Sequence, residues 1–122
     1  MEWVTGIQRA IDYVEAHLTE EIDYEAVAKE SCSSAFHFQR VFGIMCGFSL
    51  GDYIRMRRLS QAAAELLQTG SRVIDVALKY GYDSPESFCR AFTKFHGITP
   101  STAKAGGAGL RSFSRLSVKL VL

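Results

Sequence analysis

A repeat at an offset of about fifty residues constrains the fold of this chain more than any other feature. Val27 and Ala28 recur as Val76 and Ala77, and the register then slips by one residue. Beyond the slip, the first copy contains Ser34, Phe38, Arg40, Phe42, Gly47 and Ser49, and the second contains Ser84, Phe88, Arg90, Phe92, Gly97 and Thr99. Self-similarity at a fixed spacing indicates that one supersecondary unit is present twice.

The first copy has the start and stop signals of two short helices. Asp23 is a good N-cap for a helix through Val27, and Ser33 or Ser34 caps a second helix that Gly47 ends. Only a few residues separate the two helices. Two helices joined by a tight turn are typical of a helix-turn-helix, whose second helix can enter the major groove of DNA.

The second copy has the same signals in the same order. Ser71 is expected to cap a short helix that Gly81 breaks, and Ser84 caps a second helix with Pro85 at its first position. Thr99 opens one last turn of helix. The second helices of the two copies, about residues 34–45 and 84–96, are the candidate recognition helices.

Two further helices complete the expected fold. Apolar residues at three- and four-residue steps predict a first helix from about Trp3 to Leu18, and Ser49 opens a long helix that reaches about Thr69 before Gly70. This long helix spans about 30 Å, close to one turn of B-DNA at about 34 Å. The fold class is therefore all-α, with two helix-turn-helix subdomains joined by a long central helix and about seven helices.

The helical period divides each recognition helix into a buried and an exposed side. The residues expected to be buried are Phe38, Val41, Phe42 and Met45 in the first copy and Phe88, Phe92 and Phe95 in the second. The residues expected to face outward and contact DNA are Ser34, Phe36, Gln39 and Arg40 in the first copy and Glu86, Ser87, Cys89, Arg90 and Lys94 in the second.

The chemistry of the outward residues favours reading of DNA. Arg40 and Arg90 occupy equivalent positions in the two copies, and arginine and glutamine side chains such as Gln39 form hydrogen bonds with guanine and adenine edges. Phe36 either contacts a thymine methyl group or extends the core, and both possibilities stay open. Cys89 is interpreted as a small helix-face residue rather than a sensor of oxidants.

Basic residues on the long helix are a second set of candidates. Arg55, Arg57 and Arg58 lie on this helix, and Arg55 and Arg57 are the DNA-binding candidates among them. Some of the three arginines are expected to contact DNA phosphates, and at least one is expected to pair with an acid from the first helices. His37 and His96 are interpreted as helix-face or capping residues, because no nucleophile or carboxylate stands at a spacing that would support catalysis.

Charge is distributed unevenly along the chain, although the formal net charge is only +1. Residues 1–30 carry two basic and eight acidic side chains, and residues 31–122 carry twelve basic and five acidic ones. The resulting balances of −6 and +7 suit a one-sided binder of nucleic acid. Simple solvation of the first helices explains the acidic residues equally well.

Composition and motifs argue against several other classes of protein. Cys32, Cys46 and Cys89 form no CxxC pair and no histidine lies at metal-ligand spacing from them, so no disulfide framework, zinc site or other cofactor is expected. No glycine-rich phosphate loop or nucleophile–base pair is present, which argues against an enzyme. The chain has no apolar run of about 18 residues and no signal peptide, which predicts a cytoplasmic protein without a membrane partner.

A larger set of residues carries a family resemblance. In the second copy these are Ile74, Asp75, Val76, Ala77, Gly81, Tyr82, Ser84, Phe88, Arg90, Phe92, Lys94, Gly97, Thr99, Pro100 and Ser101, and in the first Ala28, Ser34, Phe38, Arg40, Phe42, Gly47, Tyr53, Ile54, Arg57 and Leu59. About residues 7–102 resemble the DNA-binding domain of the AraC/XylS family of bacterial transcription regulators. Two sites depart from the family pattern, Ala103 in place of a common aromatic residue and Pro85–Glu86 in place of amide or hydroxyl side chains.

The resemblance implies a sequence-specific transcriptional regulator that binds double-stranded DNA and acts on RNA polymerase. It places residues matching Phe36, Gln39 and Arg40 in one major-groove segment, and residues matching Glu86, Ser87, Cys89 and Arg90 in the next. It assigns Gly81, Phe88, Phe92 and Pro100 to the core. The alternative is a helical protein–protein interaction module without DNA binding, which the salt dependence of affinity would distinguish.

The order of segments predicts the domain organisation. Residues 1–104 are expected to form the double helix-turn-helix domain, and residues 105–122 a linker and the start of a truncated second domain, because Leu116, Val118 and Leu120 alternate like a strand. This order resembles the subgroup in which a gyrase-inhibitor-like effector-binding domain follows the DNA-binding domain. A small-molecule effector would then act only through the missing domain.

Overall fold

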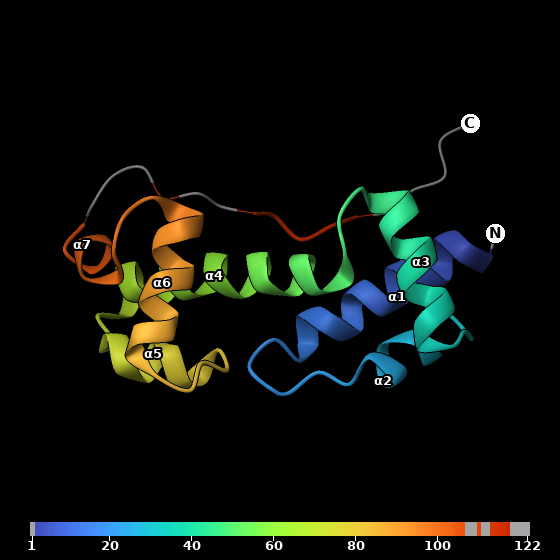
Figure 1. Ribbon diagram of the computed structural model, residues 1–122, viewed down its shortest axis with the longest axis horizontal. Helices are drawn as coiled ribbons and strands as arrows, with labels where there is room; N and C mark the ends of the chain where they lie inside the picture. Colours follow the sequence, from blue (N-terminus) through green and yellow to red (C-terminus); the bar gives the residue numbers. More distant parts are fainter. Residues whose placement is uncertain (1, 107–109, 111–112, 118–122) are drawn as a thin grey trace. The chain divides into compact units, whose positions relative to one another are not determined.

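The computed structural model describes residues 2–106, 110 and 113–117, and this part of the chain contains seven helices and no strand. The helices are α1 (Glu2–Ala16), α2 (Tyr24–Lys29), α3 (Ala35–Cys46), α4 (Leu50–Thr69), α5 (Val73–Lys79), α6 (Pro85–His96) and α7 (Pro100–Lys104), as labelled in Figure 1. The chain divides into two compact units, residues 1–54 with 115–122 (unit 1) and residues 55–114 (unit 2). The prediction of an all-α fold with two helix-turn-helix subdomains is confirmed.

Unit 1 is built around α2, which packs against α1 and α3. The apolar stripe of α1 meets the buried residues of the other helices in a core of Ile7, Ala10, Ile11, Val14, Leu18, Val27, Ala28, Phe38, Phe42, Leu50, Tyr53 and Ile54. The ring of Phe42 lies 5.9 Å from that of Phe38 and 6.0 Å from that of Tyr53. The helix α1 also approaches the turn after α2 closely, because a Cβ added at Gly6 would lie only 2.8 Å from the Cβ of Ser31.

The caps of unit 1 follow the sequence signals. The carboxylate of Asp23 accepts a hydrogen bond from the amide of Glu25, and the Oγ of Ser34, rather than that of Ser33, accepts one from the amide of His37. Gly47 ends α3 in the left-handed conformation, at φ 82°. Each helix of the motif therefore begins or ends where a side chain or a glycine satisfies its free backbone groups.

The turns of the two motifs have different residues at the left-handed position. Cys32 has φ 55° after α2, and it corresponds to Gly81, which has φ 88° after α5. In each turn the next residue donates its amide back into the preceding helix, from Ser33 to the carbonyl of Ala28 and from Tyr82 to that of Ala77. A side chain in this region is strained and glycine is not, so unit 1 carries a cost in its turn that unit 2 avoids.

We expect Cys32→Gly to raise the free energy of unfolding of the chain by about 0.5–1 kcal/mol, because relief of the left-handed strain outweighs the added freedom of the unfolded chain. Urea denaturation of the two proteins measures the difference. The reciprocal change Gly81→Ala is the matched control and should destabilise. A loss of stability in Cys32→Gly would show that the thiol, and not the backbone, determines this position.

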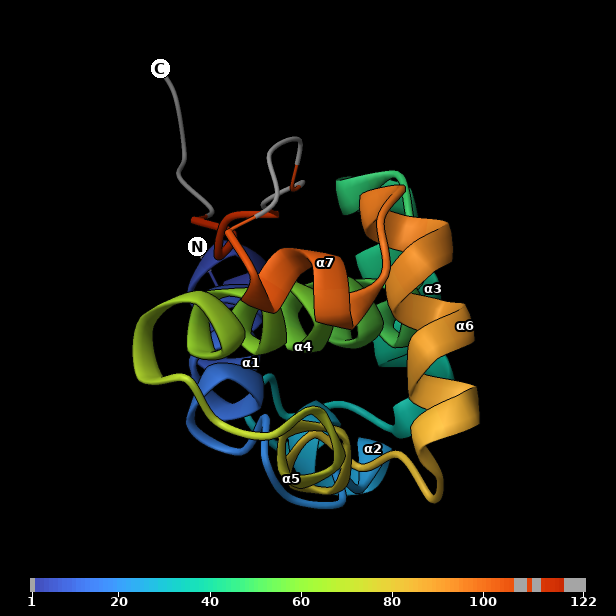
Figure 2. The same ribbon diagram turned by 90° about the vertical axis from the view of Figure 1, so that its left-hand side faces the viewer.

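Unit 2 has its own core between α4, α5, α6 and α7. The core consists of Leu59, Ala62, Ala63, Leu66, Val76, Ala77, Tyr80, Phe88, Phe92 and Ala103. In Figure 2, α5 is seen end-on whereas α6 runs along the plane of the view, so the two helices of the motif are far from parallel. The α7 helix is only five residues long and buries Ala103 completely, in agreement with the short last turn expected from the sequence.

A burial expectation and a capping expectation were wrong. Met45 is 44% exposed, because the neighbouring described helices cover only part of the apolar arc on α3. Arg72, not Ser71, is the N-cap of α5, and its side chain makes no capping hydrogen bond. The Oγ of Ser71 instead lies 2.7 Å from the Oγ1 of Thr69.

His96 is a core residue rather than the helix-face or capping residue expected. It is 3% exposed, and its Nε2 lies 2.9 Å from the carbonyl oxygen of Leu59. The ring also packs against the rings of Phe92 and Phe95, with centroid distances of 4.3 and 4.7 Å. These contacts attach the end of α6 to α4 within unit 2.

A polar contact attaches α5 to α4 in the same unit. The carboxylate of Glu65 accepts a hydrogen bond from the hydroxyl of Tyr80 and forms an ion pair with Lys79, both at 2.6 Å. Burial raises the pKa of Tyr80 well above its usual range, and the Glu65 carboxylate adds to the effect, so the phenol remains a donor. Burial acts to raise the pKa of Glu65 as well, but the hydrogen bonds from Lys79 and Tyr80 outweigh it and lower this pKa.

The lowered pKa of Glu65 makes its contribution to stability dependent on pH. The ionised carboxylate stabilises the fold above the ordinary pKa of 4.5, and this stability is lost as the pH falls through the lower pKa of the folded state. We expect Glu65→Gln to cost about 1 kcal/mol at pH 7 and progressively less below pH 4.5. Urea denaturation of both proteins at several pH values measures this difference, and a difference independent of pH would contradict the assignment.

The segment after α7 is described only in part. Residues 110 and 113–117 have no regular secondary structure, so the strand expected around Leu116 is not found there, and Val118 and Leu120 lie outside the described residues. The amide of Phe113 donates to the Oγ of Ser60 in unit 2, at 2.8 Å. In unit 1 the amide of Leu116 donates to the hydroxyl of Tyr53, at 3.2 Å. The linker and truncated second domain remain a prediction.

Candidate nucleic-acid interface

The two recognition helices share one design. Both α3 and α6 are 12 residues long, follow a serine N-cap and end at a glycine in the left-handed conformation. The fourth and eighth residues of each helix are the buried phenylalanines, Phe38 and Phe42 in α3 and Phe88 and Phe92 in α6. Because the buried positions coincide, the same helical positions of α3 and α6 are directed away from the two cores.

The sixth residue of each recognition helix is an exposed arginine, Arg40 in α3 and Arg90 in α6. Phe36 is 73% exposed, which excludes the interpretation that it extends the core. Gln39 is also exposed, and its Nε2 donates to the carbonyl of Ala35 at 3.2 Å, so this side chain must turn away from its own helix before it can reach a base. An exposed aromatic ring next to amide and guanidinium donors suits a groove that presents methyl groups and acceptors.

The α6 helix presents a more mixed surface. Glu86, Arg90 and Lys94 are exposed at four-residue steps, whereas Ser87 and Cys89 are half-buried. The Oγ of Ser87 donates to the carbonyl of Ser84 at 3.1 Å, so this hydroxyl is engaged at the start of the helix. The exposed stripe therefore combines one carboxylate with two cations.

The Ser34 hydroxyl, expected to face DNA, is exposed but serves as the cap of α3. The backbone amides of the first turn of α3 lie at the same end of the helix as Ser34. Backbone amides and the positive end of a helix dipole favour phosphate groups there.

The arginines of α4 separate into exposed and buried residues. Arg55 is exposed, whereas Arg57 is only 8% exposed and donates from Nη1 to the carbonyl of Phe113 at 2.6 Å. A guanidinium held inside unit 2 in this way cannot also reach a phosphate, so we omit Arg57 from the candidate interface.

Arg58 is a further basic residue that the candidate set omitted. Its Nη1 lies 3.8 Å from the position that a Cβ on Gly81 would occupy, in the turn before α6. Burial raises the pKa of the Tyr82 hydroxyl, while the positive charges of Arg55 and Arg58 act to lower it, so both guanidinium groups lie near this turn. Spacing along α4 could not have singled out Arg58, because its position depends on where the second motif packs.

Other kinds of site find little support in the described residues. Cys32, Cys46 and Cys89 are free, and burial raises the pKa of Cys46. The described histidine, cysteine and acidic residues form no group of three that could hold a metal ion. Within the same part of the chain, no helix is long and apolar enough to cross a membrane.

Comparison with known proteins gives the family. A family model described as "Helix-turn-helix domain" matches residues 27–106, from within α2 to just beyond α7. The transcriptional activator AarP of Providencia stuartii is 38% identical over 114 residues, which cover 93% of this chain and 84% of AarP. The chain belongs to the AraC/XylS family of helix-turn-helix regulators.

Other AraC/XylS relatives extend the comparison. YbfP of Bacillus subtilis, an uncharacterised HTH-type transcriptional regulator, is 43% identical over 100 residues, which cover 82% of this chain but only 34% of YbfP. The DNA-binding domain of AdpA, solved in complex with a target DNA, is 25% identical with a TM-score of 0.73, over 82% of this chain and 90% of that domain. This AraC/XylS chain thus spans about a third of the length of YbfP and most of the length of AarP.

Proposed function

We propose that this chain is the DNA-binding domain of a transcriptional regulator, and that α3 and α6 each read one of two adjacent major-groove segments. The observation that carries the proposal is the equivalent placement of Arg40 and Arg90, each the exposed sixth residue of the second helix in a helix-turn-helix. The likeness to a domain solved with its target DNA supports it. The proposed base-reading set is Phe36, Gln39, Arg40, Glu86, Cys89 and Arg90.

The remaining candidates are assigned to the phosphate backbone. Ser34 is the N-cap of α3 and Ser87 lies in the first turn of α6, where backbone amides suit a phosphate. Arg55 and Lys94 are exposed cations on α4 and α6. Phosphate contacts of this kind orient the domain without selecting a sequence.

The length of α4 supports recognition of adjacent segments. This helix has 20 residues and contributes to both units, which corresponds to about 30 Å. The repeat of B-DNA is about 34 Å, and the proposal requires α3 and α6 to lie on one face of the duplex, with a slight bend of the DNA. Contact with RNA polymerase and control by an effector-binding domain are further proposals that rest on the family resemblance.

Selection against a random duplex library tests the proposed function. We expect the 122-residue chain to recover an asymmetric site with two short conserved blocks about one helical turn apart. Affinity for the selected duplex should fall steeply between two salt concentrations, because bound phosphates release counterions. If no duplex sequence were enriched at low salt, the alternative of a protein–protein interaction module would be favoured instead.

A further inference from the structure

Unit 2 contains a cavity of about 430 Å³ between α4 and α6. Its walls are Arg55, Met56 and Leu59 from α4 and Ala91, Lys94 and Phe95 from α6. The volume lies within the range of about 300–1,000 Å³ that is typical of small-molecule sites. The two helices that form the cavity are attached by the contact of His96 with the carbonyl of Leu59, so the site exists before any ligand binds.

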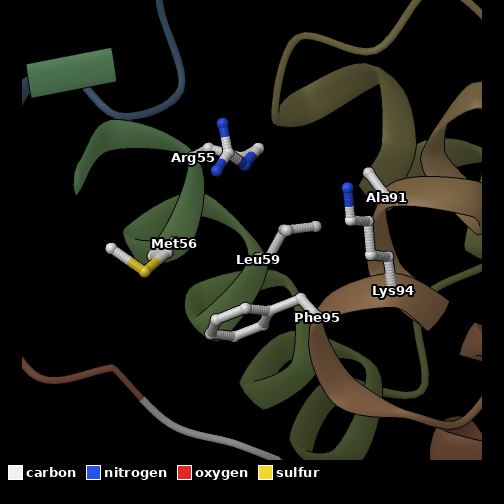
Figure 3. Close-up of a pocket in the computed structure, with 6 residues that line it drawn as sticks. All are labelled: Arg55, Met56, Leu59, Ala91, Lys94 and Phe95. Atoms are coloured by element: carbon white, nitrogen blue, oxygen red, sulfur yellow. The ribbon is translucent and has the colours of Figure 1, made fainter. Parts of the chain in front are cut away.

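The lining of the cavity combines an apolar wall with two cations. Figure 3 shows the charged ends of Arg55 and Lys94 toward one side, the ring of Phe95 on the other, and Leu59 between them. Met56 extends the apolar part of the wall. Lys94 is exposed and makes no ion pair or hydrogen bond with any other residue that the structure describes.

This combination selects the chemistry of the occupant. A carboxylate can accept hydrogen bonds from a guanidinium and an ammonium group at once, and an aromatic or aliphatic body can fill the space beside Phe95, Leu59 and Met56. A DNA phosphate would satisfy the two cations but leave the apolar wall without contacts. A neutral apolar molecule would fill the cavity but would gain nothing from the charges of Arg55 and Lys94.

We propose that this cavity binds a small organic anion with an apolar body, such as an aromatic carboxylate, and that the bound anion weakens DNA binding. The second part rests on the proposed function, in which Arg55 and Lys94 contact phosphates. An anion between these side chains neutralises both, and it therefore competes with the DNA backbone. The DNA-binding domain itself would then respond to a metabolite, separately from any effector-binding domain.

A titration of the 122-residue chain followed by amide chemical shifts tests the site. The probe is 2-naphthylacetate, with neutral 2-naphthylacetamide and with acetate as matched controls. We expect saturable shifts at the cavity residues with 2-naphthylacetate, and binding of the amide weaker by about tenfold. Equal binding of 2-naphthylacetate and 2-naphthylacetamide would overturn the proposal. Equal effects of acetate on the same residues would also overturn it, and would indicate a simple anion-binding site for a phosphate.

Three variants locate the ligand. Ala91→Leu reduces the cavity and keeps both cations, so it should abolish saturable binding. Lys94→Gln, at an exposed position, should weaken binding about threefold to fivefold, whereas Lys104→Gln removes an equal charge from the exposed end of α7 and should not. Unchanged binding in both Ala91→Leu and Lys94→Gln would overturn the proposal even if one variant were less stable.

Competition with the selected duplex separates the two proposals. We expect 2-naphthylacetate to lower the apparent DNA affinity of the chain, and we expect Ala91→Leu to lose this response. If saturating 2-naphthylacetate left the DNA affinity unchanged, the proposed competition between ligand and DNA would be wrong. A chain that binds the ligand but no duplex would instead contradict the proposed function, because the titration decides the site on its own.

Discussion

Replacement of Phe88 by alanine is expected to lower the free energy of unfolding by about 3–5 kcal/mol. Phe88 is fully buried in unit 2, and its ring lies 5.3 Å from that of Tyr82 and 5.5 Å from that of Phe92. The truncation removes apolar contacts on several sides and leaves a cavity that the packed helices cannot close. Because a domain is stable by only about 5–15 kcal/mol, the change removes a large share of the total.

Urea denaturation followed by circular dichroism measures this loss. Phe36→Ala is the matched control, because Phe36 lies on the exposed side of α3 and should cost within about 0.5 kcal/mol. A cost below about 1 kcal/mol for Phe88→Ala would contradict the assignment of this ring to the core. A large cost for Phe36→Ala would show that its ring is covered.

Replacement of Arg40 or Arg90 by alanine is expected to weaken binding to the selected duplex by about 1–3 kcal/mol each, or roughly fivefold to 150-fold. Both guanidinium groups are at the exposed sixth position of a recognition helix, where bidentate contact with a guanine is possible. Fluorescence anisotropy with the wild-type site and with single base changes measures the effect.

The pattern across sequences distinguishes the two roles of an arginine. A base contact relaxes specificity at one position of the site, whereas a phosphate contact weakens binding to all sequences and reduces the salt slope by about 1. Arg9→Ala, which removes an exposed arginine from α1, is the matched control and should leave affinity unchanged. If neither Arg40→Ala nor Arg90→Ala weakened binding, the proposed interface would be wrong.

The helices and their ends could be predicted from the sequence because they depend on local chemistry. Asp23, Ser34, Ser84 and Thr99 accept hydrogen bonds from the first turns of α2, α3, α6 and α7, as their positions before apolar runs predicted. The one-residue slip in the repeat corresponds to the longer turn after Gly81 in unit 2. Such signals act within a few residues, so they can be read without knowledge of the tertiary fold.

Burial of individual side chains could not be predicted as well. Periodicity placed Met45 on the buried face of its helix but could not show how far the neighbouring helices extend over that face. Arg57 matches the family pattern and lies on α4 together with Arg55 and Arg58. Among the arginines that the structure describes, it alone is buried. Its hydrogen bond to Phe113 joins residues 56 positions apart in the sequence, and no local signal carries that information.

The sequence by itself determined the seven helices, the caps of α2, α3, α6 and α7 and the repeated motif, because hydrogen bonds and helical periods are local properties of the chain. Only the tertiary structure decided which candidate residues remain accessible, that Arg55 and Lys94 line the same cavity, and that His96 joins α6 to α4. These outcomes depend on close packing between elements distant in sequence, where shape and exclusion of water, rather than local preference, determine the contacts.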